Sequence, residues 1–219
     1  VTTAQWVEFF NAAYNRPAAE ALPHLQPPDF WGAHSVAPLI PGGRRWAVTA
    51  GQDLHPVGDI SWRMAAMYCN WLCNGKSGDR SAFLNGAYDV STFGFADPFG
   101  FSDQLTHNPG AQYWIPTWDE WLKAAHFDPN KPNPDGTTGG WWRYSNTSDT
   151  APIYGPPNTG GQANAGFLSA QAYTIPLGAY ATVQSPWGLL DVAGATTEWT
   201  EEIKDLGTGG RYRYFDGSY

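Results

Sequence analysis

The N-terminal stretch carries apolar residues at the spacing of an amphipathic helix. Trp6, Phe9, Phe10 and Ala13 recur at i, i+3, i+4 and i+7, which places them on one helix face. The threonines just before them supply the hydroxyl groups that commonly cap a helix N-terminus. The pattern therefore predicts a helix over residues 2–13 with one buried, aromatic-rich face.

A second helical pattern covers residues 63–73 and follows Ser61, which can cap it. Its small apolar residues share one side of the helix and are expected to face the core: Ala65, Ala66, Cys69 and Leu72. Cys69 and Cys73 are the only cysteines of the chain, and two thiols four residues apart on a helix are poorly placed to bond to each other. We interpret both as small core residues, with a metal or redox role as the alternative.

The third helical pattern follows Thr117 and shows the clearest local chemistry in the chain. Thr117 and Glu120 have the Thr-x-x-Glu spacing of a capping box, in which each side chain accepts a hydrogen bond from the other residue's backbone. Acids fall in the first turn, and Lys123 and His126 lie toward the C-terminal end, as the helix dipole favours. The neighbouring acids Asp119 and Glu120 are therefore interpreted as residues that stabilise the start of the helix and not as a catalytic pair.

The segments between the helical patterns are rich in glycine and proline. Residues 17–56 lack a sustained period and predict surface loops with short extended pieces, whereas residues 139–144 predict a strand. Prolines alternate along residues 128–135, which predicts an exposed turn. Residues 78–112 form an insertion whose acids are expected to be solvated loop charges: Asp89, Asp97 and Asp103.

Residues 185–200 read Ser-Pro-Trp-Gly-Leu-Leu-Asp-Val-Ala-Gly-Ala-Thr-Thr-Glu-Trp-Thr. Gly188 and Gly194 supply backbone freedom at tight corners. The apolar residues between them are expected to be buried: Leu189, Leu190 and Val192. The simplest interpretation is a buried turn and a short strand whose acids are satisfied by backbone amides, with Glu198 as a candidate ligand or network anchor.

Composition limits both the fold class and the partners. The 219 residues include 12 Trp, 11 Tyr, 11 Phe, 25 Gly and 18 Pro, which indicates a loop-rich fold with aromatic anchors instead of a helical bundle. The formal net charge is −8 with only 12 Lys and Arg, so nucleic acid is not an expected partner. No apolar run approaches the roughly 18 residues of a membrane span.

The stretch 185–200 resembles the Gly-Leu-x-Asp-Met-x-Gly-Asn-Val-x-Glu-Trp-Thr signature of the formylglycine-generating-enzyme family, also called the sulfatase-modifying-factor family. The matching positions are Gly188, Leu189, Asp191, Gly194, Glu198, Trp199 and Thr200. Three further stretches resemble family motifs in the same order: residues 1–9, 56–72 and 114–125. The resemblance implies an α+β, C-type-lectin-like fold with short helices, a small twisted antiparallel sheet and much irregular loop. It implies one domain over residues 1–219 that lacks its first strand and its C-terminal segment.

The resemblance also implies metal sites. Calcium is bound near the signature in the family, which makes Asn164, Thr196 and Glu198 the candidate calcium ligands here. Ala195 stands where the family usually has the Asn that helps to bind this calcium. Catalytic members hold copper through two redox-active cysteines, as a soft Cu(I) ion prefers. That cysteine pair is not present in this chain.

Two functions remain open, because a fold does not fix a function. We favour a secreted or cell-surface binding or structural module, whose partner is a protein, a carbohydrate or further copies of the chain. The aromatic-rich loops suit such contacts, and residues 114–142 resemble a subgroup of secreted bacterial proteins. The alternative is a copper-dependent oxidase that converts a sulfatase cysteine to formylglycine. Sulfoxide synthases of thiohistidine biosynthesis share the domain, but they need a separate histidine-rich domain that this sequence does not show.

Overall fold

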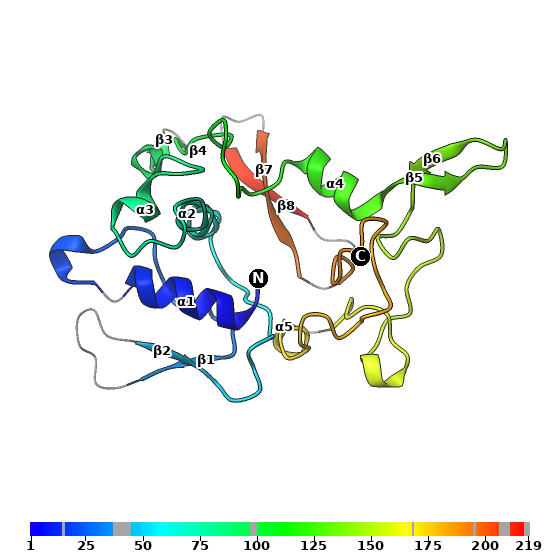
Figure 1. The fold of residues 1–219 in the computed structure, drawn as a ribbon, viewed down its shortest axis with the longest axis horizontal. Coiled ribbons are helices and arrows are strands. Elements are labelled where there is room, and N and C mark those ends of the chain that lie inside the picture. The colour runs from blue at the N-terminus through cyan, green and yellow to red at the C-terminus, as the bar shows by residue number, and fades with distance from the viewer. Residues whose placement is uncertain are drawn as a thin grey trace. The chain divides into compact units, whose positions relative to one another are not determined.

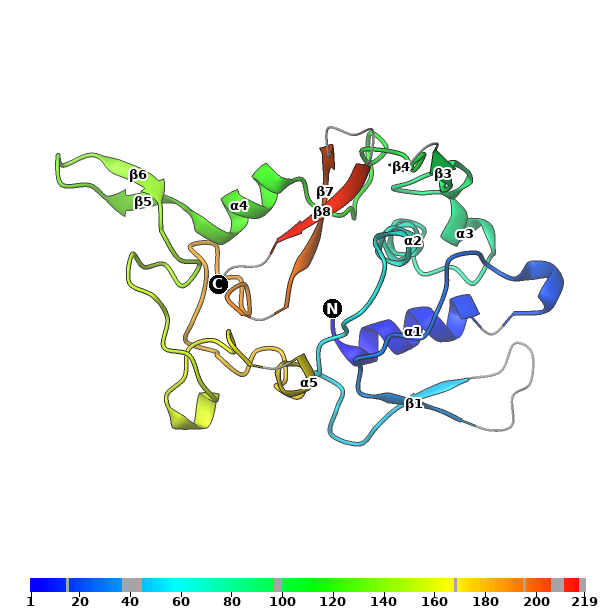
Figure 2. The same ribbon diagram turned by 180° about the vertical axis from the view of Figure 1, so that it is seen from behind.

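The computed structural model describes residues 1–14, 16–36, 45–96, 100–167, 169–194, 196–205 and 211–216. The fold is α+β, as expected: short helices and small two-stranded sheets are joined by long irregular loops (Figures 1 and 2). The chain divides into two compact units. Unit 1 comprises Val1–Ile115 with Glu201–Tyr214, and unit 2 comprises Pro116–Thr200 with Phe215–Tyr219.

The elements are short throughout. The α-helices are α1 (Thr3–Tyr14), α2 (Trp62–Cys73), α3 (Ser81–Leu84), α4 (Trp118–His126) and α5 (Ser169–Ala172). The 3-10 turns are η1 (Ala18–Glu20), η2 (Val90–Thr92) and η3 (Pro157–Thr159). The strands are β1 (Ala33–Ser35), β2 (Trp46–Val48), β3 (Phe95–Ala96), β4 (Gly100–Phe101), β5 (Phe127–Pro132), β6 (Thr138–Trp141), β7 (Glu198–Asp205) and β8 (Arg211–Asp216).

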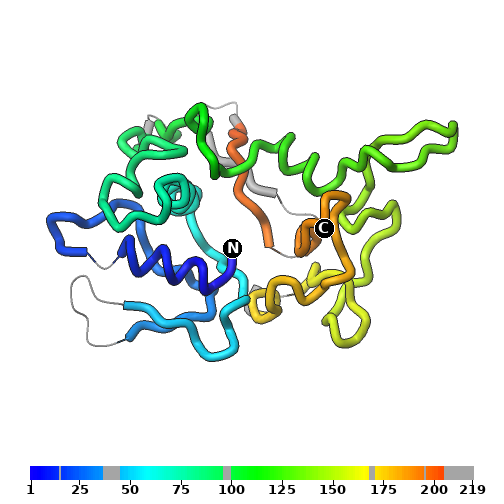
Figure 3. The backbone as a smooth tube through the Cα atoms, in the orientation of Figure 1, coloured from blue at the N-terminus to red at the C-terminus, as the bar shows by residue number. Residues whose placement is uncertain are grey.

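Each strand pairs with its neighbour in sequence. In the described chain these pairs form four separate two-stranded sheets, where a single small sheet was expected. Short pairs of this kind bury little on their own, so the aromatic side chains around them carry the core. Among the described helices, none is long and apolar enough to cross a membrane. The path of the chain through these elements can be followed in Figure 3.

The core of unit 1 lies between α1 and α2; α1 lies across both views, whereas α2 is seen end-on (Figures 1 and 2). The predicted face of α1 is confirmed, because Trp6, Phe9 and Phe10 are fully buried. Phe9 packs against Trp71 of α2 and Phe83 of α3, with ring centroids 5.6 and 6.0 Å apart. These contacts join three elements of unit 1 in one aromatic cluster.

The N-terminus of α1 is closed by reciprocal hydrogen bonds. The Thr2 hydroxyl accepts the Gln5 amide proton at 3.2 Å, and the Gln5 side chain accepts the Thr2 amide proton at 3.0 Å. This is the capping-box arrangement with glutamine in place of glutamate, and it confirms the predicted hydroxyl cap.

The buried face of α2 differs from the predicted one. Ser61 does cap the helix, since its hydroxyl accepts the Met64 amide proton at 3.2 Å. Of the predicted stripe, however, only Ala66 is buried. The residues that fill the core from this helix are Trp62, Met64, Ala66, Met67, Asn70 and Trp71. Larger side chains remove more apolar surface from water, so the large residues set the rotation of the helix.

The prediction of a solvated Asp103 is wrong. Its side chain is 4% exposed and receives two hydrogen bonds from Arg63, at 2.7 and 2.8 Å. Asp103 also accepts the Gly94 amide proton at 3.1 Å. The ion pair therefore holds Gly94 and Asp103 to α2 across 40 positions between Arg63 and Asp103, which acid spacing alone could not reveal. Asp89 accepts the Ser91 amide proton at the start of η2, and Asp97 lies outside the described residues.

In unit 2, α4 begins at the predicted capping box. The Thr117 hydroxyl accepts the Glu120 amide proton at 3.2 Å, and the Glu120 carboxylate accepts the Thr117 amide proton at 2.8 Å. The chain then continues into the β5–β6 hairpin (Figure 1).

The prediction of an exposed turn over residues 128–135 is only partly right. Asp128 pairs with Gly140 in the β5–β6 hairpin, and Trp142 donates its indole proton to Asp128 at 3.1 Å. The register shifts between Asp128 and Pro132, because proline lacks the amide proton that a regular ladder needs. The turn is confined to the residues between the two strands, and the predicted strand ends at Trp141.

Candidate functional site

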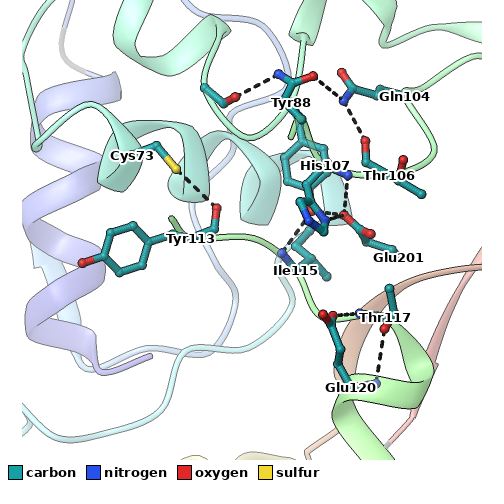
Figure 4. A network of polar contacts seen from close by, with 12 residues as sticks. Cys73, Tyr88, Gln104, Thr106, His107, Tyr113, Ile115, Thr117, Glu120 and Glu201 are labelled. Carbon is teal, nitrogen blue, oxygen red and sulfur yellow. Dashed lines mark hydrogen bonds and ion pairs between the residues drawn. The ribbon is translucent and has the colours of Figure 1, made fainter. Parts of the chain in front are cut away.

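A buried carboxylate organises one polar network of unit 1 (Figure 4). The Glu201 side chain, on β7, is 2% exposed. Its Oε1 atom accepts hydrogen bonds from the Tyr88 hydroxyl at 2.6 Å and from the His107 backbone amide at 2.7 Å. The His107 ring nitrogen Nδ1 lies 3.0 Å from the same oxygen.

The carboxylate orients the His107 ring. An ionised carboxylate only accepts hydrogen bonds, so a hydrogen bond from the ring to it requires a proton on Nδ1. The ring stacks on Trp114, with centroids 4.6 Å apart and planes inclined by 19°. The result is an oriented acid–histidine pair beside an indole that is 38% exposed.

Tyr88 links this pair to Ile115, the last residue in the first segment of unit 1. Its oxygen accepts the Ile115 amide proton at 3.0 Å while its proton goes to Glu201. Burial raises the pKa of the Tyr88 phenol, and the hydrogen bond to Glu201 raises that pKa further. Tyr88 therefore remains a protonated donor at any physiological pH.

The Cys69 thiol near this network is not activated for nucleophilic attack. Burial raises the pKa of the Cys69 thiol to about 12, so the thiol stays protonated at neutral pH. The Cys73 thiol contacts the Tyr113 carbonyl oxygen at 3.4 Å (Figure 4). We therefore interpret the Glu201 network as an anchor that holds Tyr88, His107 and Ile115 near β7, with the His107 side chain partly exposed.

The signature turn, defined as residues 184–190, is exposed in unit 2. Ser185 donates its amide proton to the Leu189 carbonyl at 2.9 Å, and Gly188 donates to the Ser185 carbonyl at 2.9 Å, with Gly188 at a φ of 79°. The predicted burial of this turn is wrong, because Leu189 is 46% and Leu190 is 39% exposed. A tight turn brings its backbone together and points its side chains outward. Val192, beyond the turn, is partly buried.

Trp187 is the largest exposed side chain of the signature turn, at 52%. Its indole nitrogen donates to the Lys123 carbonyl near the C-terminal end of α4 at 3.1 Å. This bond satisfies the polar atom of the indole and holds one edge of the ring, while the rest of the ring remains open to solvent.

A small hollow lies beside the signature turn and opens to solvent. Asp191 lines it, and its Oδ2 atom accepts the Gly178 amide proton at 2.6 Å. This contact confirms that a signature acid is satisfied by a backbone amide. Asp191 has a φ of 59°, in the left-handed region. Burial raises the pKa of the Asp191 carboxyl, and the Gly178 hydrogen bond opposes that shift.

The family model for the sulfatase-modifying factor enzyme 1-like domain, FGE-sulfatase, matches residues 1–219. The chain belongs to the FGE-sulfatase family. A crystal structure of a protein named CarF is similar in fold, with a TM-score of 0.54, 21% sequence identity, and coverage of 100% of this chain and 72% of the CarF chain. No curated protein matches the chain.

The cysteines of this FGE-sulfatase domain do not fit the copper site of the family's catalytic members. Such a site needs two thiolates that converge on Cu(I). Cys69 is held as a protonated thiol, and Cys73 contacts a backbone carbonyl. Within the described ranges, no three His, Cys, Asp or Glu side chains are grouped so that they could hold a metal ion.

The candidate calcium ligands Asn164, Thr196 and Glu198 all fall in unit 2. The Asn164 side-chain oxygen lies so close to Gly194 that a β-carbon on Gly194 would be 2.3 Å from it. Asn164 thus reaches the signature although it lies 30 positions earlier in the chain. Carboxamide and carboxylate oxygens are the donors that calcium prefers. Ala195 lies outside the described residues.

Sequence reasoning missed the Glu201 network and the Asp191 hollow. Both are assembled from segments far apart in the chain, such as Tyr88 with Glu201 and Gln162 with Asp191. The one local signal was the acid at position 191 of the signature stretch, next to a turn that contains glycine.

Proposed function

We propose that this FGE-sulfatase domain is a binding module of a secreted or cell-surface bacterial protein, and that it contacts a partner protein through the signature turn. The observation that carries the proposal is the exposure of three large apolar side chains on one tight turn: Trp187, Leu189 and Leu190. Contiguous exposed apolar residues are characteristic of contact surfaces, whereas isolated ones are ordinary.

The turn is held in shape before any partner arrives. Its backbone is closed by the Ser185 and Gly188 hydrogen bonds and by the bridge between Gln184 and Leu190. The Trp187 indole is tied to α4. A contact that is already ordered loses little conformational freedom on binding, so more of its apolar burial contributes to affinity.

The composition of the turn favours a protein partner over a carbohydrate. Two of its three large exposed apolar side chains are aliphatic, and the nearby Ile153 is 62% exposed on a segment bonded to Gln162 of the hollow. Aliphatic groups gain from burial against other apolar side chains and offer a sugar few polar contacts. A tryptophan among them is a typical central residue of a protein interface.

We also propose a structural role for calcium, with Asn164, Thr196 and Glu198 as ligands. The closeness of Asn164 to the signature supports it. Calcium at millimolar concentration is then expected to raise the melting temperature of the wild-type chain and not that of N164A.

The binding proposal is tested with peptides selected on the immobilised chain from a random display library. Their affinities are measured by calorimetry for wild type, W187A, L189A and the control L105A. Leu105 is 49% exposed in unit 1, so it matches Leu189 in type and exposure but lies outside the turn. W187A and L189A are expected to weaken binding by about tenfold or more, and L105A to leave it unchanged.

Equal binding by wild type and L189A would overturn the proposed contact surface. Conversion of a cysteine in a sulfatase-type peptide to formylglycine, in the presence of copper and oxygen, would overturn the non-catalytic assignment. Sedimentation that shows self-association dependent on Trp187 would replace the partner protein by a second copy of the chain.

A further inference from the structure

We propose that the hollow beside the signature turn binds the ammonium group of a lysine side chain presented by the partner protein. The inference rests on the proposed function and deepens it, because it names the side chain that the surface selects. It is carried by the charge, the size and the walls of the hollow.

The charge of the hollow selects a cation. Asp191 is the one charged side chain among the residues that line it, and no positively charged residue is among them. One carboxylate oxygen receives the Gly178 amide proton. A carboxylate offers about four lone-pair positions, so Asp191 can accept further hydrogen bonds from an incoming donor.

Polar oxygens near Asp191 can complete the coordination of an ammonium group. Tyr180 lines the hollow and donates its hydroxyl proton to the Gly155 carbonyl at 3.0 Å, which leaves its oxygen able to accept. Ser145 lines the hollow as well and is 2% exposed. An ammonium group has three donors and no acceptor, which matches a set of acceptor oxygens.

The size of the hollow favours lysine over arginine. Its innermost space admits a group of about the size of one water molecule. An ammonium group is of that size, whereas a guanidinium is a wide planar fork that needs a broader site.

The walls of the hollow suit the rest of a lysine side chain. Leu189 and Val183 line it, and Leu189 belongs to the exposed signature turn. A lysine stem consists of four methylene groups that can pack along apolar side chains while the charged end reaches a polar partner. The apolar contact surface of the turn therefore extends into the hollow, where the charged Asp191 lies.

The protein's own charge supports the same occupant. Asp191 is partly buried, and a buried carboxylate gains when a cation replaces the water it has lost. The chain as a whole carries a formal net charge of −8, which attracts cationic partners over a distance.

The test uses nuclear magnetic resonance titrations of the whole chain with N-acetyl-lysine methylamide. The norleucine analogue has a similar stem without the charge, and the arginine analogue has the charge on a larger group. The lysine probe is expected to give saturable shifts of the Gly178 and Asp191 amide signals. The norleucine and arginine probes are expected to bind at least about tenfold more weakly.

The decisive variant is D191N, which keeps the oxygen that accepts the Gly178 proton and removes the charge. Asparagine also adopts the left-handed backbone region readily, so the turn at position 191 is preserved. D119N is the matched control, because Asp119 is an exposed acid in the first turn of α4 in the same unit. D191N is expected to lose lysine-probe binding, and D119N to retain it.

Equal lysine-probe binding by D191N and wild type, or equal binding of the norleucine probe, would overturn the lysine site. If peptide binding depends on Leu189 but not on Asp191, the lysine site is refuted and the binding surface is supported. If binding of the lysine probe depends on Asp191 while binding of no peptide depends on Leu189, the hollow is supported as a cation site and the proposed surface is refuted.

Discussion

The Tyr88 hydroxyl donates to the Glu201 carboxylate across 2.6 Å, although the two residues lie 113 positions apart in the chain. The contact closes the first segment of unit 1 onto β7, which returns to that unit at Glu201. Because the same phenol oxygen accepts the Ile115 amide proton, one side chain satisfies two buried groups. If the phenol were removed, each of these buried groups would lose a hydrogen bond that water could not replace, and this desolvation penalty is the contact's main contribution to stability.

Replacement of Tyr88 by phenylalanine is expected to destabilise the protein by roughly 1–3 kcal/mol, because it leaves a buried carboxylate and a buried amide each without one partner. Urea denaturation measures the change. Y113F serves as the control, since Tyr113 is 49% exposed and is expected to change stability by less than about 0.5 kcal/mol. Similar unfolding midpoints for wild type and Y88F would contradict this role of the phenol.

The Arg63–Asp103 pair offers a comparison between a buried and an exposed ion pair. Asp103 is 4% exposed, so R63A leaves an uncompensated buried charge and is expected to cost about 3–5 kcal/mol. Lys76 and Glu8 pair at 2.7 Å with side chains 46% and 52% exposed, and K76A is expected to cost about 0–1 kcal/mol. Thermal unfolding of the two variants should therefore differ clearly, and equal losses would argue against the buried pair as an anchor.

Two tryptophans of family motifs are expected to differ in their contribution to stability. Trp121 on α4 is 8% exposed and stacks on Trp118 with centroids 5.7 Å apart, so W121A is expected to cost roughly 3–5 kcal/mol. Trp199 on β7 is only partly buried, which places W199A below that range. Chemical denaturation of both variants checks the order, and a larger loss in W199A would reverse it.

The parts of the fold that could be predicted are those specified within one stretch of sequence. The capping box at Thr117 and Glu120 involves residues three apart, and the buried face of α1 follows from a helical period. The period alone predicts the wrong face of α2, because Ala65 and Met64 both fit a helical period and only packing decides between them. The Asp191 hollow depends on Tyr180 and Gln162, and no local pattern relates these residues.

The Cys69 thiol is expected to resist alkylation in the folded protein. A pKa of about 12, against 9.0 for an unperturbed thiol, lowers its thiolate fraction near neutral pH by roughly a thousandfold. Mass spectrometry after iodoacetamide treatment at pH 8, with and without urea, measures the protection. Because the thiol has a packing role, C69A is expected to retain peptide binding, and rapid native-state alkylation would contradict this assignment.

The stability of the protein is expected to depend on pH through the Asp191 carboxyl. Its pKa in the folded protein lies above the ordinary value of 3.8, so the folded state binds this proton more tightly than the unfolded state does. Stability that this group contributes in acid is therefore lost as the pH rises from 3.8 through the raised pKa, and remains lost above it. D191N cannot ionise and keeps an acceptor for Gly178, so it is expected to be more stable than wild type at pH 7.

Unfolding midpoints of wild type and D191N, measured between pH 3 and pH 8, test this sign. The advantage of D191N should shrink as the pH falls through the raised pKa, because wild-type Asp191 then becomes neutral as well. The lysine probe should raise the stability of the wild type at neutral pH, since a bound cation stabilises the ionised carboxylate and lowers its pKa. A D191N variant that is less stable than wild type at pH 7 would mean that the charge of Asp191 is already compensated in the folded chain, and the hollow would then have no need of a cationic ligand.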